Sequence, residues 1–204
     1  MDLEEFNATL VEIKNDEGLL DFCRKWVLHG TPYIFHAREE ELYEFRKKIA
    51  CGLHVSFHEI FITGSAKLGF SPHKGTEFSY DSDVDIAIIS PSLFESMMGH
   101  IYKFQVDLRR SRRAVDEREL AMYHEFLEYA AIGWIRPDKL PLSFKAKELK
   151  AGWFEFFDSL SYGKSEVGDY KVAAGVFKSY YYLEQYLVGG LRSARSKAIV
   201  ELKK

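Results

Sequence analysis

Two short hydrophobic runs, joined by a loop that contains glycine and proline, constrain this chain more than any other feature. The first run, residues 59–63, ends at Gly64-Ser65, and the second run, residues 84–89, follows Ser82-Asp83. Both are rich in isoleucine and bounded by turn-forming residues, a pattern typical of buried β-strands. The sequence therefore predicts two strands, each with polar residues at one end.

Apolar residues recur at helical spacing on both sides of these strands. Leu42, Phe45 and Ile49 predict a helix over 38–51, with Gly52 as its stop signal. A further helix carries Leu149, Trp153, Phe156 and Leu160 on one face. Other helices are expected over 17–28, 93–112, 116–132 and 178–188, a third strand over 170–177, and a loop over 133–138. The last of these helices is expected to close at Gly189-Gly190.

The order of these elements predicts a mixed α/β fold, in which a small mixed sheet is packed against helices. We expect a single domain over residues 1–204. Its core would comprise about 38–91 and 165–190, and the long helical stretch of about 92–160 would be an insertion beside the sheet.

Composition excludes several classes of protein. The net charge of −3 argues against a globally basic nucleic-acid binder. The densest basic cluster, Arg109, Arg110, Arg112 and Arg113, is expected to be a solvated helix face. The apolar segments around Cys23 and Cys51 favour reduced, buried thiols, and no apolar stretch has the length of a membrane span. We therefore expect a cytoplasmic protein without a membrane partner.

The strand beginning at Asp83 carries the chemistry. Side chains alternate along a strand, so Asp83 and Asp85 project to one side while Val84 and Ile86 enter the core. Two adjacent carboxylates repel each other unless a cation compensates them. A hard divalent ion, completed by substrate phosphates, is the natural partner. The pattern predicts a magnesium or manganese site used in phosphoryl displacement.

The turn after the first strand supplies the complementary half of the site. Gly64 allows close approach of the backbone, and Ser65 adds a hydroxyl beside backbone N–H groups that favour anions. Lys67 has two equally weighted interpretations, a ligand of the terminal phosphates or an exposed loop residue.

Gly64-Ser65 at the end of one strand and Asp83-x-Asp85 on the next resemble the polymerase-β-like nucleotidyltransferase superfamily. The resemblance covers about 38–90, and the longer pattern of residues in this stretch is similar to a bacterial branch of that superfamily. It implies a glycine-serine turn that holds the triphosphate, aspartates that bind two Mg²⁺ ions, and transfer of a nucleoside monophosphate to a hydroxyl with release of pyrophosphate. Some related branches serve in toxin–antitoxin or phage-defence systems, which implies a toxin or effector protein as a partner.

The same resemblance implies a third carboxylate on a later strand. Three residues are candidates. Asp107 falls in a predicted helix, Asp158 lies in the predicted helix that contains Trp153, and Asp169 begins the third predicted strand. Asp169 is the preferred third metal ligand.

The acceptor and the catalytic competence stay open. A nucleotide, an oligonucleotide or a protein side chain would each present a hydroxyl, and a non-catalytic protein that binds a nucleotide or a toxin is the alternative function. Tyr180, Tyr181, Tyr182 and Tyr186 would either stack on a nucleobase or, as we favour, pack on the sheet.

Overall fold

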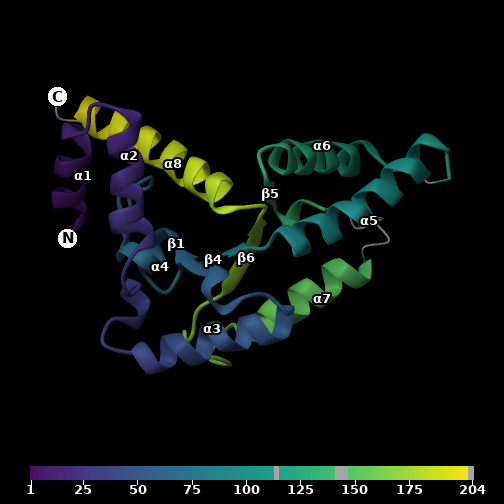
Figure 1. Ribbon diagram of the computed structural model, residues 1–204, viewed down its shortest axis with the longest axis horizontal. Coiled ribbons are helices and arrows are strands. Elements are labelled where there is room, and N and C mark those ends of the chain that lie inside the picture. The colour runs from purple at the N-terminus through teal and green to yellow at the C-terminus, as the bar shows by residue number, and fades with distance from the viewer. Residues whose placement is uncertain (113–114, 141–146, 202–204) are drawn as a thin grey trace.

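The computed structural model describes residues 1–112, 115–140 and 147–201, and a four-stranded sheet lies at its centre (Figure 1). Its strands are β1 (Ile60–Thr63), β4 (Val84–Ile89), β5 (Trp134–Ile135) and β6 (Val172–Phe177), in the order β1-β4-β6-β5. Strand β4 is antiparallel to β1 and parallel to β6, and β5 is antiparallel to β6. A separate hairpin joins β2 (Phe70–Ser71) to β3 (Thr76–Glu77).

Helices surround this sheet. They are α1 (Leu3–Glu12), α2 (Asp16–Phe22), α3 (Glu39–Leu53), α4 (Gly64–Leu68), α5 (Pro91–Arg109), α6 (Glu117–Ala131), α7 (Lys147–Asp158) and α8 (Tyr180–Glu201). A π-helical segment, η1 (Cys23–Leu28), extends α2, and short 3₁₀ turns occur at η2 (Tyr33–Phe35), η3 (Phe57–Glu59) and η4 (Pro137–Lys139). The mixed α/β class predicted from sequence is confirmed.

The alternation of side chains along β4 gives the sheet two different faces. Val84, Ile86 and Ile88 enter the main hydrophobic core, where they join residues of α3, α5 and α7 such as Phe45. The opposite face carries Asp85, together with smaller apolar contacts to α8. On this second face Ala87 and Ile89 are buried, and Asp85 is the exposed residue of β4.

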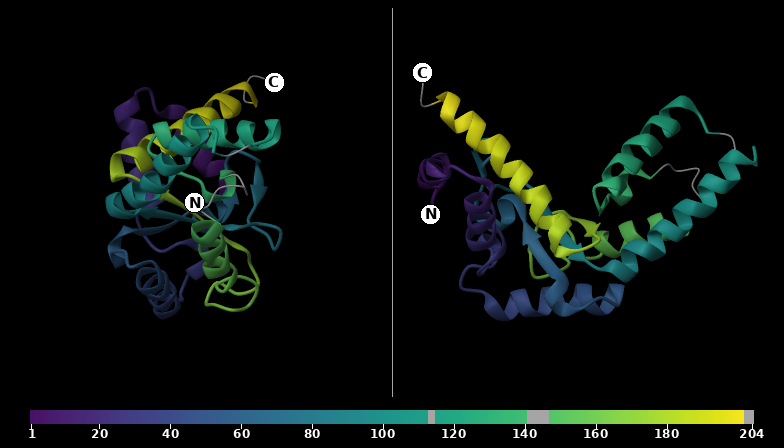
Figure 2. Two further views of the ribbon diagram at one scale, coloured as in Figure 1. Left: turned by 90° about the vertical axis from the view of Figure 1, so that its right-hand side faces the viewer. Right: turned by 45° about the horizontal axis from the view of Figure 1, so that its top comes forward.

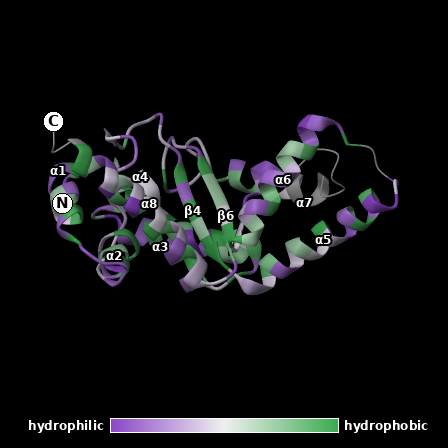
Figure 3. Ribbon diagram, turned by 90° about the horizontal axis from the view of Figure 1, so that it is seen from above, coloured by the Kyte–Doolittle hydropathy of each residue, from purple (hydrophilic) through white to green (hydrophobic). Residues whose placement is uncertain are grey.

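Two helical groups flank the sheet. Figure 3 shows β4 and β6 between a group formed by α1, α2, α4 and α8 and a group formed by α5, α6 and α7. In the right-hand view of Figure 2, α8 and the α5–α6 pair diverge from the sheet. The hydroxyl of Tyr123 on α6 donates to Oε1 of Gln105 on α5 at 2.7 Å, and the rings of Tyr123 and Phe104 are in edge contact. Helices α5 and α6 thus form a paired arm, whereas β5 and α7, which fall in the same predicted stretch of about 92–160, join the sheet and the main core.

Two helix ends differ from the prediction. Gly52 does not stop α3, because the helix continues to Leu53 and His54 takes the left-handed conformation at its end. A Cβ on Gly52 would lie 2.2 Å from the ring of Phe156, so this glycine admits a close contact with α7. Helix α8 likewise passes through Gly189 and Gly190.

Burial explains why α8 continues. Val188, Leu191 and Ala194 of α8 lie in a second core cluster with Phe6 of α1 and Phe22 of α2. Each glycine costs a helix about 1 kcal/mol, and packing of the amphipathic face onto α1 and α2 offsets that cost.

Two smaller expectations also change. The segment over 133–138 is not only a loop, since Trp134–Ile135 forms the sheet's fourth strand. Cys23 is buried as expected, but Cys51 is exposed. The basic cluster matches its expectation, since Arg109, Arg110 and Arg112 are all exposed at or just after the end of α5; Arg113 lies outside the described residues.

Candidate functional site

The two predicted halves of the site meet at one edge of the β1–β4 pair. Thr63 at the end of β1 lies opposite Asp85 of β4, so Gly64 follows directly beside the aspartate. Gly64 has φ +63°, and a Cβ placed there would lie 2.9 Å from Asp85 Oδ2. Both the backbone conformation and the close approach therefore require glycine at this position.

Asp83 and Asp85 both line the same cavity, which has a volume of about 740 Å³. Asp83 precedes β4, and Asp85 is the second residue of that strand. Lys171, directly before β6, donates from Nζ to Asp83 Oδ2 at 3.0 Å. The backbone links the same two segments, because the N–H of Val84 donates to the carbonyl oxygen of Lys171 at 2.8 Å.

The electrostatics of Asp85 match the predicted repulsion. Its side chain is exposed, but the surrounding cavity wall partly removes it from water, and the negative charge of Asp83 adds to this effect. Together they raise the pKa of Asp85 to about 6. Lys171, Arg136 and Lys74 oppose the shift with their positive charges. The ionised carboxylate thus gains from a cation placed near it.

Three basic residues line this cavity. Lys171 and Lys74 approach from the start of β6 and from the β2–β3 hairpin, and Arg136 follows β5. Asp138 holds the Arg136 guanidinium with contacts of 2.8 and 3.2 Å. The guanidinium carbon also lies 5.1 Å from the centre of the Tyr129 ring. A positive group fixed in this way suits recognition of a phosphate.

Sequence reasoning missed these basic residues for a topological reason. Lys171 precedes the strand that pairs in parallel with β4, and Arg136 follows a strand that was expected to be a loop. Recognition that 84–89 and 172–177 are adjacent parallel strands would have identified Lys171, because equivalent ends of parallel strands lie at one edge of a sheet.

The floor of the cavity is made of small residues. Ala87 and, on the neighbouring strand, Ala173 and Gly175 lie on the same face as Asp85. A Cβ on Gly175 would lie 2.3 Å from Trp134 Nε1, so the indole ring rests on the β6 backbone. Tyr186 of α8 also lines the cavity, with its ring 4.4 Å from that of Trp134.

The predicted tyrosine cluster packs on the sheet only in part. Tyr182 and Tyr186 pack against the Trp134 and Phe177 side chains, as the favoured interpretation requires. Tyr180, Tyr181 and Tyr186 are nevertheless all exposed, and the Tyr180 ring contacts the edge of Phe61 on β1.

Lys67 occupies neither of its predicted environments. It is only 6% exposed, and its ammonium group donates to the carbonyl oxygen of Gly30 at 2.7 Å and to that of His29. It does not line the cavity beside Ser65. Burial lowers the pKa of Lys67 to about 8. Lys67 therefore ties α4 to the turn after η1, and it does not contact the proposed phosphate region.

Among the residues that the structure describes, no third carboxylate forms a metal-binding group with Asp83 and Asp85. Asp169 lies exposed in the loop before β6, and Asp107 is on α5. Across residues 1–112, 115–140 and 147–201, no three His, Cys, Asp or Glu side chains form a group able to hold a metal. Ala173 is the residue of β6 paired with Asp85. Asp158, at the end of α7, lines the cavity but belongs to no such group.

Comparison with protein-family models, with curated proteins and with solved structures found no match to this chain. Among the helices that the structure describes, none combines the length and the apolar character needed to cross a membrane.

Proposed function

We propose that this protein is a metal-dependent nucleotidyltransferase that moves a nucleoside monophosphate from a ribo- or deoxyribonucleoside triphosphate to a hydroxyl group. The observation that carries the proposal is the contact between the two predicted motifs. Gly64 lies against the Asp85 carboxylate, and Ser65, Asp83 and Asp85 line one cavity. The distribution of charge supports it too, because two carboxylates face the positive Lys74, Arg136 and Lys171.

Asp83 and Asp85 fit a hard divalent ion such as Mg²⁺ or Mn²⁺. Their oxygen atoms are the ligand type that these ions prefer, and two protein carboxylates leave positions for the oxygens of the substrate phosphates. The bound ion would stabilise the charge that develops on the phosphoryl oxygens. Asp83 can exchange its ion pair with Lys171 for a bond to the metal at little cost. The pair is half-exposed, and such pairs contribute only about 0–1 kcal/mol to stability.

The residues around the carboxylates have distinct roles in this reaction. Ser65 and the backbone of Gly64 hold the terminal phosphates, and Lys171, Arg136 and Lys74 neutralise the triphosphate. The acceptor oxygen forms a bond to the α-phosphorus, the bond from that phosphorus to the bridging oxygen breaks, and pyrophosphate leaves. The hydroxyl proton passes to solvent. The acceptor is a nucleotide, an oligonucleotide or a protein side chain.

The second candidate is a protein with the same cavity that binds a nucleotide, or a toxin or effector protein, without turnover. The observation that favours it is Ala173, which occupies the position on β6 paired with Asp85 where a further carboxylate would complete the metal site. This alternative needs the triphosphate and metal contacts but no transfer step.

Turnover assays with each nucleoside triphosphate, in Mg²⁺ or Mn²⁺, separate the two candidates. We expect pyrophosphate release by the wild type, abolished in D83A and in D85A and kept in D21A, which removes an exposed aspartate on α2. Near-wild-type release by D83A or D85A would overturn the metal assignment. Nucleotide binding without pyrophosphate release or a labelled product would favour the binder.

Thermal unfolding tests the site independently of turnover. Metal and nucleoside triphosphate together should raise the melting temperature, because a ligand at one hundred times its Kd stabilises the folded state by about 2.7 kcal/mol. Metal alone should raise it much less, since magnesium binds weakly to two carboxylates without phosphates. The D83A/D85A double variant should lose most of the shift, and no shift in the wild type with any nucleotide would refute the site.

A further inference from the structure

An aromatic stack lies outside the cavity, on the segments that lead into Asp83 and Lys171. The ring of Tyr80 lies parallel to that of Tyr170, with a centroid distance of 5.7 Å and an interplanar angle of 7°. Tyr170 in turn stacks on Phe78 at 4.8 Å, and Tyr33 contacts the edge of Phe78. The two inner rings, Phe78 and Tyr170, are partly buried and pack against the main core. Tyr80 is therefore the outer ring of an ordered series.

Tyr80 is unusually open to solvent. It is 81% exposed, the highest value among the large hydrophobic side chains in the described part of the chain. Its orientation is nevertheless fixed on one side by the parallel Tyr170 ring. An exposed ring normally loses side-chain freedom when it binds a ligand, and a ring already supported by a neighbour loses less. The outward face of Tyr80 is thus a preorganised flat surface.

The chain connects this stack to the carboxylates on both sides. Tyr80 precedes Asp83 by one short turn, in which Ser82 N–H donates to the carbonyl oxygen of Ser79 at 2.9 Å. The Ser82 hydroxyl accepts from Ser79 N–H at 3.1 Å and closes the turn. Tyr170 is followed directly by Lys171, the ion-pair partner of Asp83. The two stacked rings are therefore carried by the same segments that carry the Asp83–Lys171 pair.

We propose that Tyr80, supported by Tyr170, is a stacking platform for a nucleobase of the substrate. The proposal rests on the proposed function, since the platform would hold the base of a nucleotide whose phosphate or sugar lies at Asp83 and Lys171. Stacking of a base on an aromatic ring does not depend on the identity of the base, because every base has a π-face. The platform thus orients a nucleotide without selecting among bases.

Trp134, which lines the cavity, is less suited to this role. The Trp134 ring is already stacked on Phe177 at an interplanar angle of 4° and lies 4.4 Å from Tyr186. The Arg136 guanidinium lies over the Trp134 ring at 5.2 Å. A base would have to displace these neighbours before it stacked on Trp134, whereas the outer face of Tyr80 needs no such rearrangement.

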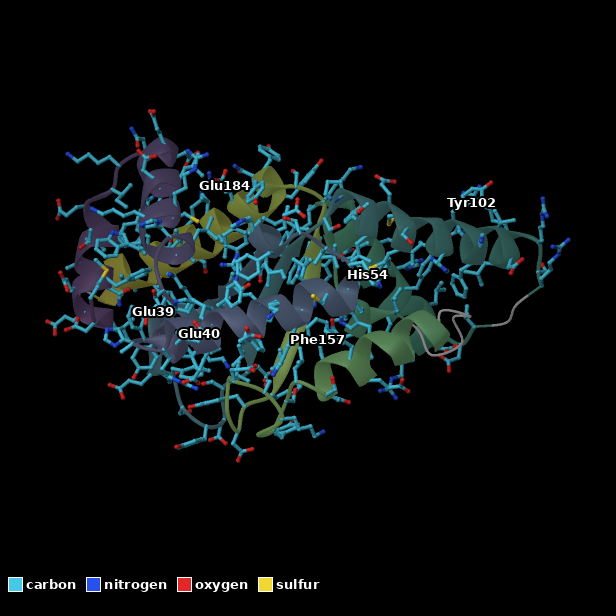
Figure 4. The ribbon with its side chains drawn as sticks, turned by 60° about the horizontal axis from the view of Figure 1, so that its bottom comes forward. Glu39, Glu40, His54, Tyr102, Phe157 and Glu184 are labelled. Carbon is cyan, nitrogen blue, oxygen red and sulfur yellow. The ribbon has the colours of Figure 1, made fainter. Side chains whose placement is uncertain are left out.

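Binding measurements with three probes test the platform. The probes are inorganic tripolyphosphate with Mg²⁺, a nucleoside triphosphate with Mg²⁺, and a single-stranded hexanucleotide without terminal phosphates. The variants are Y80A and Y80W, with Y102A as the control. Tyr102 is 71% exposed on α5 and lies away from the sheet along the arm (Figure 4). Because Tyr80 is exposed, Y80A should fold like the wild type, and circular dichroism checks this.

We expect Y80A to weaken the binding of the nucleoside triphosphate, the hexanucleotide or both by about fivefold or more, from the size of base–aromatic stacking. Y80W should keep the affinity, and Y102A should not change it. Tripolyphosphate should bind equally to Y80A and the wild type, because it has no base. Loss in the triphosphate arm alone places the base of the donor on Tyr80, and loss in the hexanucleotide arm alone places the base of the acceptor there.

Two results would overturn the platform. One is unchanged affinity of Y80A for both base-containing probes, and the other is an equal loss for tripolyphosphate, which would show that Tyr80 acts through the phosphate region. Failure of the wild type to bind either triphosphate probe would count against the proposed function. The hexanucleotide arm still decides about Tyr80 in that case, and a hexanucleotide that does not bind the wild type then overturns the platform as well.

Discussion

Substitution of Gly64 by alanine separates backbone strain from damage to the candidate site. Alanine at φ +63° is strained, and the left-handed conformation costs about 1–2 kcal/mol for a residue with a Cβ. The new Cβ would also lie 2.9 Å from Asp85 Oδ2, closer than real contacts allow. Asp85 is exposed on its strand, so its carboxylate can move aside at little cost. We therefore expect a stability loss of about 1–2 kcal/mol, set by the backbone alone.

Gly163 offers a matched control. It has φ +76°, but a Cβ there would meet nothing within 4 Å. G163A should thus lose about the same stability as G64A, a decrease in melting temperature of about 2–8 °C for a chain of this size. Only G64A should lose binding of metal and nucleoside triphosphate, because only there does the carboxylate leave its position.

Urea unfolding and calorimetric titration measure the two effects. The reasoning is wrong if G64A binds metal and nucleotide as tightly as G163A does. It is also wrong if G64A keeps wild-type stability, because the strain at positive φ would then be absent.

Three further outcomes follow from single residues. Because the pKa of Asp85 is raised to about 6, this carboxyl holds more protons in the folded protein than in the unfolded chain between about pH 4 and 6. Its contribution to the free energy of unfolding therefore falls as the pH rises through that range. D85N should then be more stable than the metal-free wild type above pH 6 and equally stable below pH 4, in urea unfolding at each pH. The lowered pKa of Lys67, about 8, has the opposite consequence: its contribution to wild-type stability should rise between about pH 8 and 10, and K67M should lack that rise. H54G should raise the melting temperature, since His54 has φ 53° at the end of α3, and glycine there removes strain of about 1 kcal/mol; an unchanged or lower value would contradict this.

The local sequence determined the elements whose signals are strong. The alternation of Asp83, Val84, Asp85 and Ile86 defined both a strand and its buried face, because the period of a strand is two residues. The apolar repeat over Phe94, Met97 and Ile101 likewise defined α5, where these side chains are buried. Gly64-Ser65 and Asp83-x-Asp85 could be paired from the sequence because short segments link both motifs to adjacent strands.

The tertiary structure alone decided which distant residues share the cavity. Lys171 and Arg136 come from segments far from Asp85 in the chain, and only the order β1-β4-β6-β5 brings them to it. The fate of Lys67 was also a tertiary matter, because the carbonyl groups of His29 and Gly30 that accept its hydrogen bonds come from the turn after η1. Likewise α8 continues through two glycines because α1 and α2 bury its apolar face. Local propensities are worth about 1 kcal/mol or less per residue, whereas burial of a large apolar side chain is worth about 1.5–3 kcal/mol, so contacts between distant segments decide wherever the two disagree.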